Sequence, residues 1–397
     1  MIKSTIELTH FSNPKTNKAQ EYPESFKQIL NINDTQQVYD DISQWPGYAT
    51  TPLHSLTGIA QQLNLKTLWY KDEASRFGLG SFKALGGAYA VFIVLKKIIE
   101  KSTSDHVTVE DIIAQKYEHL LSDVVVSCAT DGNHGRSVAW GAKLFSCRCI
   151  IYIHRDVSTG REQAINALGA RVIRVSGNYD DSVKVAAADA LEHNRIIVSD
   201  TSYEGYTEIP KLVSLGYTVM LRETIEQLQG QIPTHVFLQG GVGGLAATVC
   251  AYFWQFWAKQ RPRIIIVEPI NANCLQKSAQ AGAPVIVTGD LDTMMAGLAC
   301  GEVSLIAWQI LEVGCDDFVT MDDSSIGTCM KLLAKGDYGD PKIVAGESAV
   351  AGLAATIGLS QSEKFRADLA LDQNSNILVF GTEGNTDPLL YQQIIDS

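Results

Sequence analysis

The sequence predicts an α/β protein in which helices cover both faces of open, twisted, mostly parallel sheets. From residue 67 onward, short segments rich in valine, isoleucine and aromatic residues alternate with amphipathic, alanine-rich segments, which is the pattern of repeated βαβ units. Most of the short segments are almost continuously apolar, as expected of strands buried on both faces. The chain has 397 residues, 46% of them hydrophobic, which favours two domains or one large domain.

Each expected element follows from this alternation. The expected strands are 67–73, 123–129, 149–154, 170–176, 195–200, 234–240, 263–269 and 376–382. The expected helices are 83–100, 133–145, 158–168, 178–192, 210–229, 242–258, 323–335 and 347–358. Roughly the first 45 residues are polar and mixed, so we expect an irregular arm there, and we expect the polar segment 100–111 to be a surface loop.

The composition argues against several classes of partner. The formal net charge is −12, and an acidic surface disfavours nucleic acid and anionic membranes as partners. No apolar run approaches the roughly 18 residues that span a bilayer. The N-terminal residues also lack the apolar core of a signal peptide. We therefore expect a soluble, cytoplasmic protein.

The eight cysteines are scattered and include no CxxC pair, so no metal site is expected. Cys147 and Cys149 lie in an apolar, strand-like run, where buried thiols are the simplest expectation. Cys274 and Cys300 flank a stretch rich in glycine and methionine. A regulatory disulfide between these two stays open, because sequence does not determine connectivity.

The stretch QGGVGGLAA, residues 239–247, follows an expected strand and opens an expected helix. We call its residues Gly240, Gly241, Val242, Gly243 and Gly244 the glycine loop. Uncovered backbone N–H groups and a helix N-terminus together form an anion site, and a phosphate group is the expected guest. The same letters match the dinucleotide fingerprint GxGxxA, with Glu268 at the end of the next strand. An NAD-linked oxidoreductase therefore stays open at this point.

The stretch SFKALGGAYA, residues 81–90, places Lys83 just past a loop and at the start of a helix. The helix macrodipole repels a cation at that end, which predicts a lowered pKa and a neutral amine. A neutral amine is what an imine-forming lysine requires. The alternative is a solvated lysine at the start of a helix.

The stretch SCATDGNHGRSVAWGAKL, residues 127–144, has the strand–turn–helix pattern of a ligand loop at the carboxyl end of a parallel strand. Its backbone N–H groups from Thr130 through Gly132 to His134 are candidates to bind a carboxylate. Asn133 is a candidate donor to a phenolic oxygen. Asp131 is either a helix cap, or a carboxylate aimed at a substrate ammonium, or a general base.

Two further strand ends carry candidate residues. Asp200 follows the expected strand 195–200, and the carboxyl ends of parallel strands face one side, so it can join Asp131 in one cleft. Thr382, in the turn FGTEGNTDP, is a candidate hydroxyl partner for a ring nitrogen. The segment 345–355 also opens a helix and could bring Glu347 or Ser348 near that ring.

Taken together, these motifs resemble the fold-type-II pyridoxal-phosphate enzymes, which include threonine dehydratase and the tryptophan synthase β subunit. The shared features are a Ser-Phe-Lys segment, an (S/T)-x-G-N-H loop about 50 residues later, and a glycine-rich loop past residue 200. Within that group the chain most resembles the diaminopropionate ammonia-lyases. The segments KDEASRFGLGSFKALGGAYA, ATDGNHGRSVAWGA and DTSYEGY carry this resemblance. The dehydratases usually have serine where this chain has Asp131.

The resemblance implies roles for individual residues. Lys83 would form the imine to pyridoxal 5'-phosphate, and Phe82 would pack beside its ring. Asn133 would contact the ring's 3-hydroxyl, the glycine loop would hold the phosphate, and Thr382 would face the pyridine nitrogen. Residues 1–88 and 206–397 would form the large cofactor-binding domain and 89–205 the small domain, with the cofactor between them. The expected assembly is a homodimer.

The reaction that the resemblance implies is the α,β-elimination of 2,3-diaminopropionate, as the L and the D enantiomer, to pyruvate and two ammonia. Lys83 would remove the α-proton on one face, and Asp131 would serve as base on the other. Asp131 and Asp200 would keep the β-nitrogen as an ammonium, which makes it a better leaving group. The nearest alternative is serine or threonine dehydration on the same scaffold. A non-enzymatic regulatory protein is a more distant alternative. The presence of the lysine, the asparagine and the glycine loop counts against it.

Overall fold

The computed structural model describes residues 6–130, 132–155 and 157–397. The chain forms two compact units. Unit 1 consists of the residues up to Ile32, Thr50–Ser75 and Met220–Ser397. Unit 2 consists of Asn33–Ala49 and Arg76–Val219. Helix α9, Glu208–Gln227, runs from the second unit into the first.

Unit 1 is built on a sheet of seven strands in the order β1-β10-β9-β8-β11-β3-β2. The five inner strands are parallel, and the two edge strands, β1 and β2, are antiparallel to their neighbours. The strands are β1 Leu8–Ser12, β2 Leu53–Ser55, β3 Thr67–Asp72, β8 His235–Gln239, β9 Arg263–Pro269, β10 Asp317–Met321 and β11 Asn376–Gly381. Since β8 and β11 are adjacent and parallel, the loops that follow them leave the sheet at the same edge.

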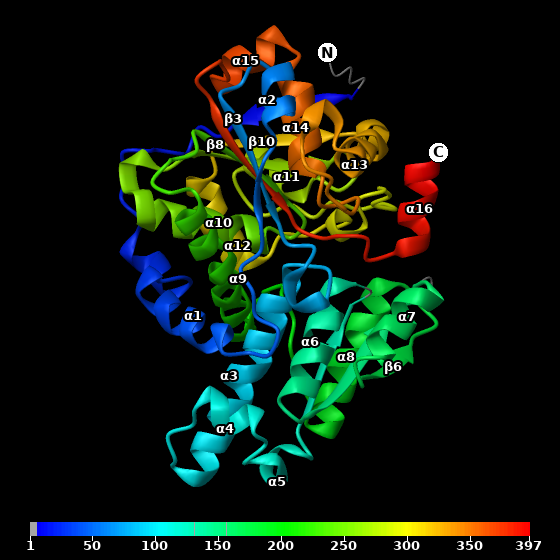
Figure 1. The fold of residues 1–397 in the computed structure, drawn as a ribbon. Helices are drawn as coiled ribbons and strands as arrows, with labels where there is room; N and C mark the ends of the chain where they lie inside the picture. The colour runs from blue at the N-terminus through cyan, green and yellow to red at the C-terminus, as the bar shows by residue number, and fades with distance from the viewer. Residues whose placement is uncertain (1–5, 131, 156) are drawn as a thin grey trace. The chain divides into compact units, whose positions relative to one another are not determined.

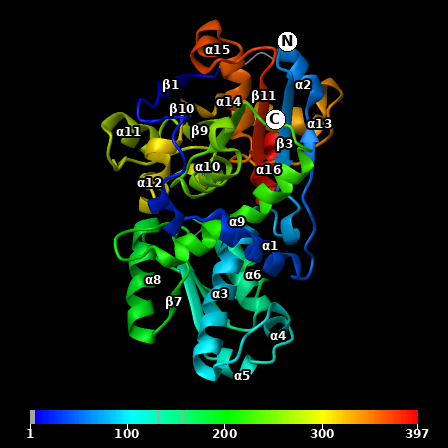
Figure 2. The same ribbon diagram turned by 90° about the vertical axis from the view of Figure 1, so that its left-hand side faces the viewer.

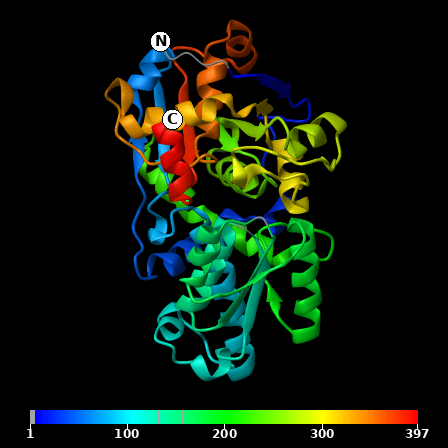
Figure 3. The same cartoon turned by 90° about the vertical axis from the view of Figure 1, so that its right-hand side faces the viewer.

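Helices cover both faces of this sheet (Figure 1). Helix α14 packs on β8 and β9 and α2 on β3, whereas α10 packs on β8 and against α12. Helix α16 lies on α13, as the red and orange ribbons in Figure 3 show. The helices of this unit are α2 Thr57–Gln62, α10 Gly244–Trp257, α11 Cys274–Ala281, α12 Leu305–Gly314, α13 Ile326–Lys335, α14 Ala351–Ser360, α15 Glu363–Leu369 and α16 Pro388–Asp396.

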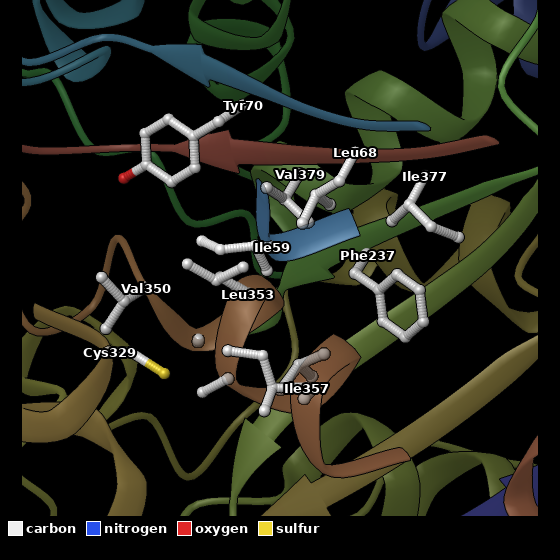
Figure 4. Close-up of a cluster of buried hydrophobic side chains, with 14 of the residues drawn as sticks. Ile59, Leu68, Tyr70, Phe237, Cys329, Val350, Leu353, Ile357, Ile377 and Val379 are labelled. Carbon is white, nitrogen blue, oxygen red and sulfur yellow. The ribbon is translucent and has the colours of Figure 1, made fainter. Parts of the chain in front are cut away.

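A hydrophobic core lies between the sheet and helices α2, α13 and α14 (Figure 4). The strands contribute residues two apart, such as Ile377 and Val379 on β11, because alternate side chains point to the same face. Leu353 and Ile357, four residues apart, are the matching pair on α14. Burial of these apolar side chains is the main stabilising term for the unit.

Unit 2 contains a parallel sheet of four strands in the order β6-β5-β4-β7. Helices α6 and α8 both contact β4 and β5, and α8 also contacts the edge strand β7 (Figure 2). The strands are β4 Val125–Ala129, β5 Arg148–Ile153, β6 Arg171–Arg174 and β7 Ile196–Ile197. The helices are α1 Thr35–Ser43, α3 Lys83–Thr103, α4 Val109–Ile113, α5 Glu118–Leu121, α6 Asn133–Leu144, α7 Thr159–Asn166 and α8 Tyr179–His193.

Helices α3 and α6 pack closely, which fixes the two segments that begin with Lys83 and Asn133 relative to each other. A Cβ atom on Gly87 would lie 2.5 Å from the Ser137 Oγ, so only glycine fits at this crossing. The same hydroxyl accepts a hydrogen bond from the Ala88 backbone N–H at 3.0 Å. The small residues of SFKALGGAYA therefore serve helix packing around Lys83.

The predicted α/β architecture with two mostly parallel sheets is confirmed. All eight expected strands and all eight expected helices are present, with ends shifted by a few residues. The expected irregular arm is wrong in part, because Leu8–Ser12 forms β1 and pairs with β10, more than 300 residues away. Among the described residues, no helix is both long and apolar enough to cross a membrane.

The units differ in their limits from the expected domains 1–88 plus 206–397 and 89–205. The chain passes between units at 32/33, 49/50, 75/76 and 219/220. The physical reason is that α3, which begins with Lys83, packs on α6, and both helices lie in unit 2.

Candidate active site

Lys83 is the first residue of α3, and its ammonium group pairs with the carboxylate of Asp200. The Lys83 Nζ also lies 5.9 Å from the centre of the Phe82 ring, which in turn packs on the Tyr217 ring with centroids 4.7 Å apart. The Lys83 side chain is 28% exposed. The position at the start of a helix favours the neutral amine of Lys83. The Asp200 carboxylate acts in the opposite direction, because a nearby negative charge favours the ammonium.

Asp200 lies three residues beyond the end of β7, in a loop that brings it to Lys83 and His134. Burial raises the pKa of Asp200, but the positive charges of His134 and Lys83 outweigh it and hold that pKa well below its usual range. Burial lowers the pKa of His134 itself. The Lys83 ammonium is therefore the stabilising charge near neutral pH, and His134 adds its own only at pH values low enough to protonate it.

His134 is buried and fixes the strand end next to Asp200. Its Nε2 lies 2.8 Å from the Val198 carbonyl oxygen. Because a carbonyl only accepts, the Nε2 carries the proton. The Nδ1 faces the Asp200 Oδ2 at 3.8 Å, which is too long for a direct hydrogen bond. Two candidate residues, His134 and Asp200, therefore lie close together, and His134 also has a structural role at the Val198 carbonyl that the sequence did not show.

The loop between β4 and α6 has the predicted strand–turn–helix form. The Thr130 N–H donates to the Tyr152 carbonyl at 3.0 Å, and the Gly132 N–H donates to the Thr130 Oγ1 at 3.3 Å. Asn133 is the first residue of α6. Asp131, for which we expect the most distinctive role, lies outside the described residues.

In unit 1, the glycine loop joins β8 to α10, as predicted. Gly241 and Gly243 have φ values of +61° and +97°, a region that side-chain-bearing residues rarely adopt. The loop is held by the Ser304 N–H, which donates to the Val242 carbonyl at 2.8 Å. The first N–H groups of α10 have no acceptor within the helix, so they are suited to an anion.

Thr382 follows β11 directly and is 5% exposed. Gln239, at the end of β8, donates from Nε2 to the Phe380 carbonyl at 2.7 Å and to the Ala349 carbonyl at 3.0 Å. This amide therefore ties the residue before the glycine loop to the strand end before Thr382. The sequence did not show this role for Gln239.

Ser348 and Glu383 form a second set of contacts next to this edge. The Ser348 N–H donates to the Glu383 Oε1 at 3.2 Å, and the Gly297 N–H donates to the Ser348 Oγ at 3.0 Å. The segment that contains Glu347 and Ser348 is thus joined to the turn after β11, in line with the expected proximity to Thr382. Glu383 was not among the expected residues, because its partners are distant in sequence.

Glu268 does not fit the dinucleotide alternative. Its carboxylate is fully buried and accepts the N–H groups of Leu275 and Gln276, both at 2.8 Å, at the start of α11. Burial raises its pKa to about 8, although the two backbone hydrogen bonds lower it. A carboxylate that caps a helix is not available to a ribose hydroxyl.

Cys274 and Cys300, like the other six cysteines, form no disulfide among the described residues. Cys274 is buried at the start of α11, and its thiol contacts the Gly241 carbonyl at 3.5 Å. Burial raises the pKa of the Cys274 thiol. This cysteine therefore supports the back of the glycine loop.

The fold and these strand-end loops define a class of enzyme. Two α/β units carry a lysine at the start of a helix, an asparagine-containing loop at another helix start, and a glycine loop suited to phosphate. This is the arrangement of a fold-type-II pyridoxal-phosphate enzyme. The left-handed glycines and the first N–H groups of α10 fit the cofactor's phosphate, and the partly exposed Lys83 at the start of α3 offers an amine for its aldehyde.

Comparisons with known proteins agree. The profile of the family described as pyridoxal-phosphate dependent enzyme matches residues 44–382. The diaminopropionate ammonia-lyase of Escherichia coli K12 is 38% identical over 358 residues, which are 88% of each chain. Its crystal structure with D-serine superposes with a TM-score of 0.89 at 33% identity, covering 98% of this chain and 97% of that one. Its structure with an aminoacrylate-PLP azomethine intermediate gives a TM-score of 0.87 at 34% identity with the same coverage.

The chain therefore belongs to the diaminopropionate ammonia-lyase family of pyridoxal-phosphate dependent enzymes. The predicted family, fold type, cofactor and enzyme class, a lyase, are confirmed. The oxidoreductase and regulatory-protein alternatives are wrong.

Proposed function

We propose that this chain eliminates ammonia from 2,3-diaminopropionate, with one water consumed and pyruvate and two ammonia released. The observation that carries the proposal is the pairing of the Lys83 ammonium with the Asp200 carboxylate. An ionised carboxylate next to the imine-forming lysine suits a substrate with a second amino group. A hydroxyl substrate such as serine would leave that charge without a cationic partner.

The cofactor roles expected from the sequence stand as part of this proposal. Lys83 would hold the aldehyde carbon of pyridoxal 5'-phosphate, Asn133 its 3-hydroxyl, the glycine loop its phosphate and Thr382 its pyridine nitrogen. When bound, the cofactor acts as an electron sink for charge that develops at the α-carbon. A neutral hydroxyl at Thr382 would leave the pyridine nitrogen less protonated than a carboxylate would.

The side chains of unit 2 would then carry out the proton transfers. Lys83, when its amine is free, would take the substrate's α-proton on its own face. In the protein without cofactor, His134 and Lys83 hold the pKa of Asp200 well below its usual range. In turnover, the substrate's distal ammonium would take the place of the Lys83 ammonium beside this carboxylate. A protonated amine is the better leaving group, so the same contact would serve both recognition and departure. Thr130, Gly132 and His134 would line the substrate carboxylate's side of the pocket.

We assign Asp131, by its place in the sequence, as the base for the D enantiomer. Lys83 reaches one face of the bound substrate, and a second base is needed on the other. Asp131→Asn is expected to lower kcat/KM for D-diaminopropionate by roughly 10²-fold or more, the contribution of one positioned base. The loss for the L enantiomer should be several times smaller. Equal losses with the two pure enantiomers, measured as pyruvate release, would contradict the assignment.

The proposed activity has a direct test. Purified protein should show a visible absorbance band of lysine-linked cofactor, and this band should change when DL-diaminopropionate is added. Two ammonia should appear for each pyruvate, whereas serine would yield one for each pyruvate and threonine one for each 2-oxobutanoate. A response to serine or threonine without any to diaminopropionate would transfer the proposal to a dehydratase on this fold.

The setting of the enzyme follows from the family and the composition. We propose that the chain works in the cytoplasm as a homodimer, as most fold-type-II enzymes do, and that unit 1 is its phosphate-binding domain. The net charge of −12 favours neither nucleic acid nor anionic membranes as partners.

A further inference from the structure

The loop that carries Asp200 begins at an edge strand. Strand β7 has only two residues, Ile196 and Ile197, and pairs with β4 on one side. On that side the Val198 N–H donates to the Ser127 carbonyl at 2.8 Å. The groups on the other side of the strand would lack a strand partner. These are the Ile197 carbonyl and the Ser199 N–H.

The Tyr206 hydroxyl takes the place of that missing strand. It accepts from the Ser199 N–H at 2.9 Å and donates to the Ile197 carbonyl at 2.9 Å. Burial raises the pKa of Tyr206, so the hydroxyl stays neutral and can do both. With the His134 contact to the Val198 carbonyl at 2.8 Å, the backbone is held from Ile197 to Ser199, directly before Asp200.

The Tyr206 ring is itself fixed by Tyr203. Each residue's N–H donates to the other's carbonyl, at 2.9 and 3.3 Å, which closes a tight turn. Their rings stack with centroids 4.9 Å apart and planes 14° apart. Tyr203 is 49% exposed. The segment after Asp200 therefore folds back, and its Tyr206 hydroxyl holds the backbone of residues 197–199 before Asp200.

We propose that Tyr206 is a positioning residue that holds the Asp200 carboxylate against Lys83 and, in turnover, against the distal ammonium of the substrate. The part that concerns the substrate rests on the proposed function. A phenylalanine would keep the ring and its stacking on Tyr203 but would lose both backbone contacts. The carboxylate would then be present but loosely placed, and a small displacement weakens a charged contact.

The test compares Tyr206→Phe with the matched control Tyr203→Phe, which removes the neighbouring hydroxyl. For diaminopropionate, Tyr206→Phe should lower kcat/KM by roughly tenfold, as expected for the loss of two part-buried neutral hydrogen bonds. For 3-chloroalanine, which has an uncharged leaving group, the loss should stay below about threefold. Tyr203→Phe should leave both values near wild type. Equal losses on the two substrates would reduce Tyr206 to a general structural role and overturn the proposal.

A double-mutant cycle and a measurement without turnover complete the test. In an Asp200→Asn background, Tyr206→Phe should lower kcat/KM for diaminopropionate by less than about twofold, because residue 200, which Tyr206 positions, no longer carries a charge. In cofactor-free protein, the pH midpoint for acetylation of the Lys83 amine, followed by mass spectrometry, should fall in Tyr206→Phe and not in Tyr203→Phe. An unchanged midpoint, or a full tenfold loss in the Asp200→Asn background, would overturn the proposal. If wild-type protein does not turn over diaminopropionate, the proposed function fails, while the acetylation midpoint still reports on Tyr206.

Discussion

Replacing Lys83 with alanine is expected to lower turnover of diaminopropionate by at least about 10³-fold. Lys83 is proposed both to anchor the cofactor and to move the α-proton, and a positioned acid–base group alone contributes 10²–10⁴-fold. The visible band of lysine-linked cofactor should also disappear. The variant should still fold, because the side chain is 28% exposed and lies at the first position of α3.

A lysine elsewhere on the same helix provides the control. Lys96 also lies on α3 and has a glutamate, Glu100, one turn away at 4.0 Å. Lys96→Ala is expected to keep both the band and the activity within about twofold of wild type. A lysine-linked band that persists in Lys83→Ala would show that another lysine carries the cofactor. Pyruvate formation by cofactor-loaded Lys83→Ala at near wild-type rate would contradict its role as base.

The strands could be predicted from the sequence where burial leaves a continuous apolar run. Thr67–Asp72 and Arg263–Pro269 are of this kind, and both lie inside the seven-stranded sheet. Leu8–Ser12 is half exposed and becomes a strand only by pairing with β10. Such an edge strand depends on a partner some 300 residues away, and no local pattern reports it.

The missed helices are mostly short, and tertiary contacts stabilise them more than propensity does. One of them, α16, has a local start signature in its sequence. Asp387 caps the Leu390 N–H at 3.2 Å, and Pro388 is the first helical residue. An acidic cap followed by proline is a recognised helix start.

In the candidate site, too, individual residues could be predicted from local sequence, whereas their contacts with distant residues could not. Lys83, Asp200 and the glycine loop could be predicted because each lies at a strand end or a helix start. The pairing of Lys83 with Asp200 requires the fold, since the two are 117 residues apart. Supporting residues such as Tyr206 act through backbone groups of their neighbours, and hydrogen bonds of that kind have no sequence pattern.

Asp200→Asn is expected to lower kcat/KM for diaminopropionate by roughly 100-fold. Losing one partner of a charged contact costs about 2–5 kcal/mol, and Asp200 is 20% exposed, so we expect a value near 2.7 kcal/mol, which is 100-fold. Asparagine keeps the shape of the side chain and removes only its charge. Elimination from 3-chloroalanine, which has no distal ammonium, should fall less than tenfold. Losses of the same size on both substrates would show that Asp200 does not recognise the distal nitrogen.

The pH dependence gives the same prediction a second, independent check. The folded pKa of Asp200 is lowered, so its favourable pairing is present above the ordinary carboxylate pKa of about 3.9. That pairing is lost only as the pH falls through the lower folded value. The loss caused by Asp200→Asn should therefore be constant between about pH 6 and 9. The exposed Asp123, 3.4 Å from Arg148 in the same unit, supplies the control substitution Asp123→Asn, which should have no effect on either substrate. A loss that vanished toward pH 6 would mean that Asp200 titrates in the working range, and its role as a permanent anion for the β-ammonium would have to be abandoned.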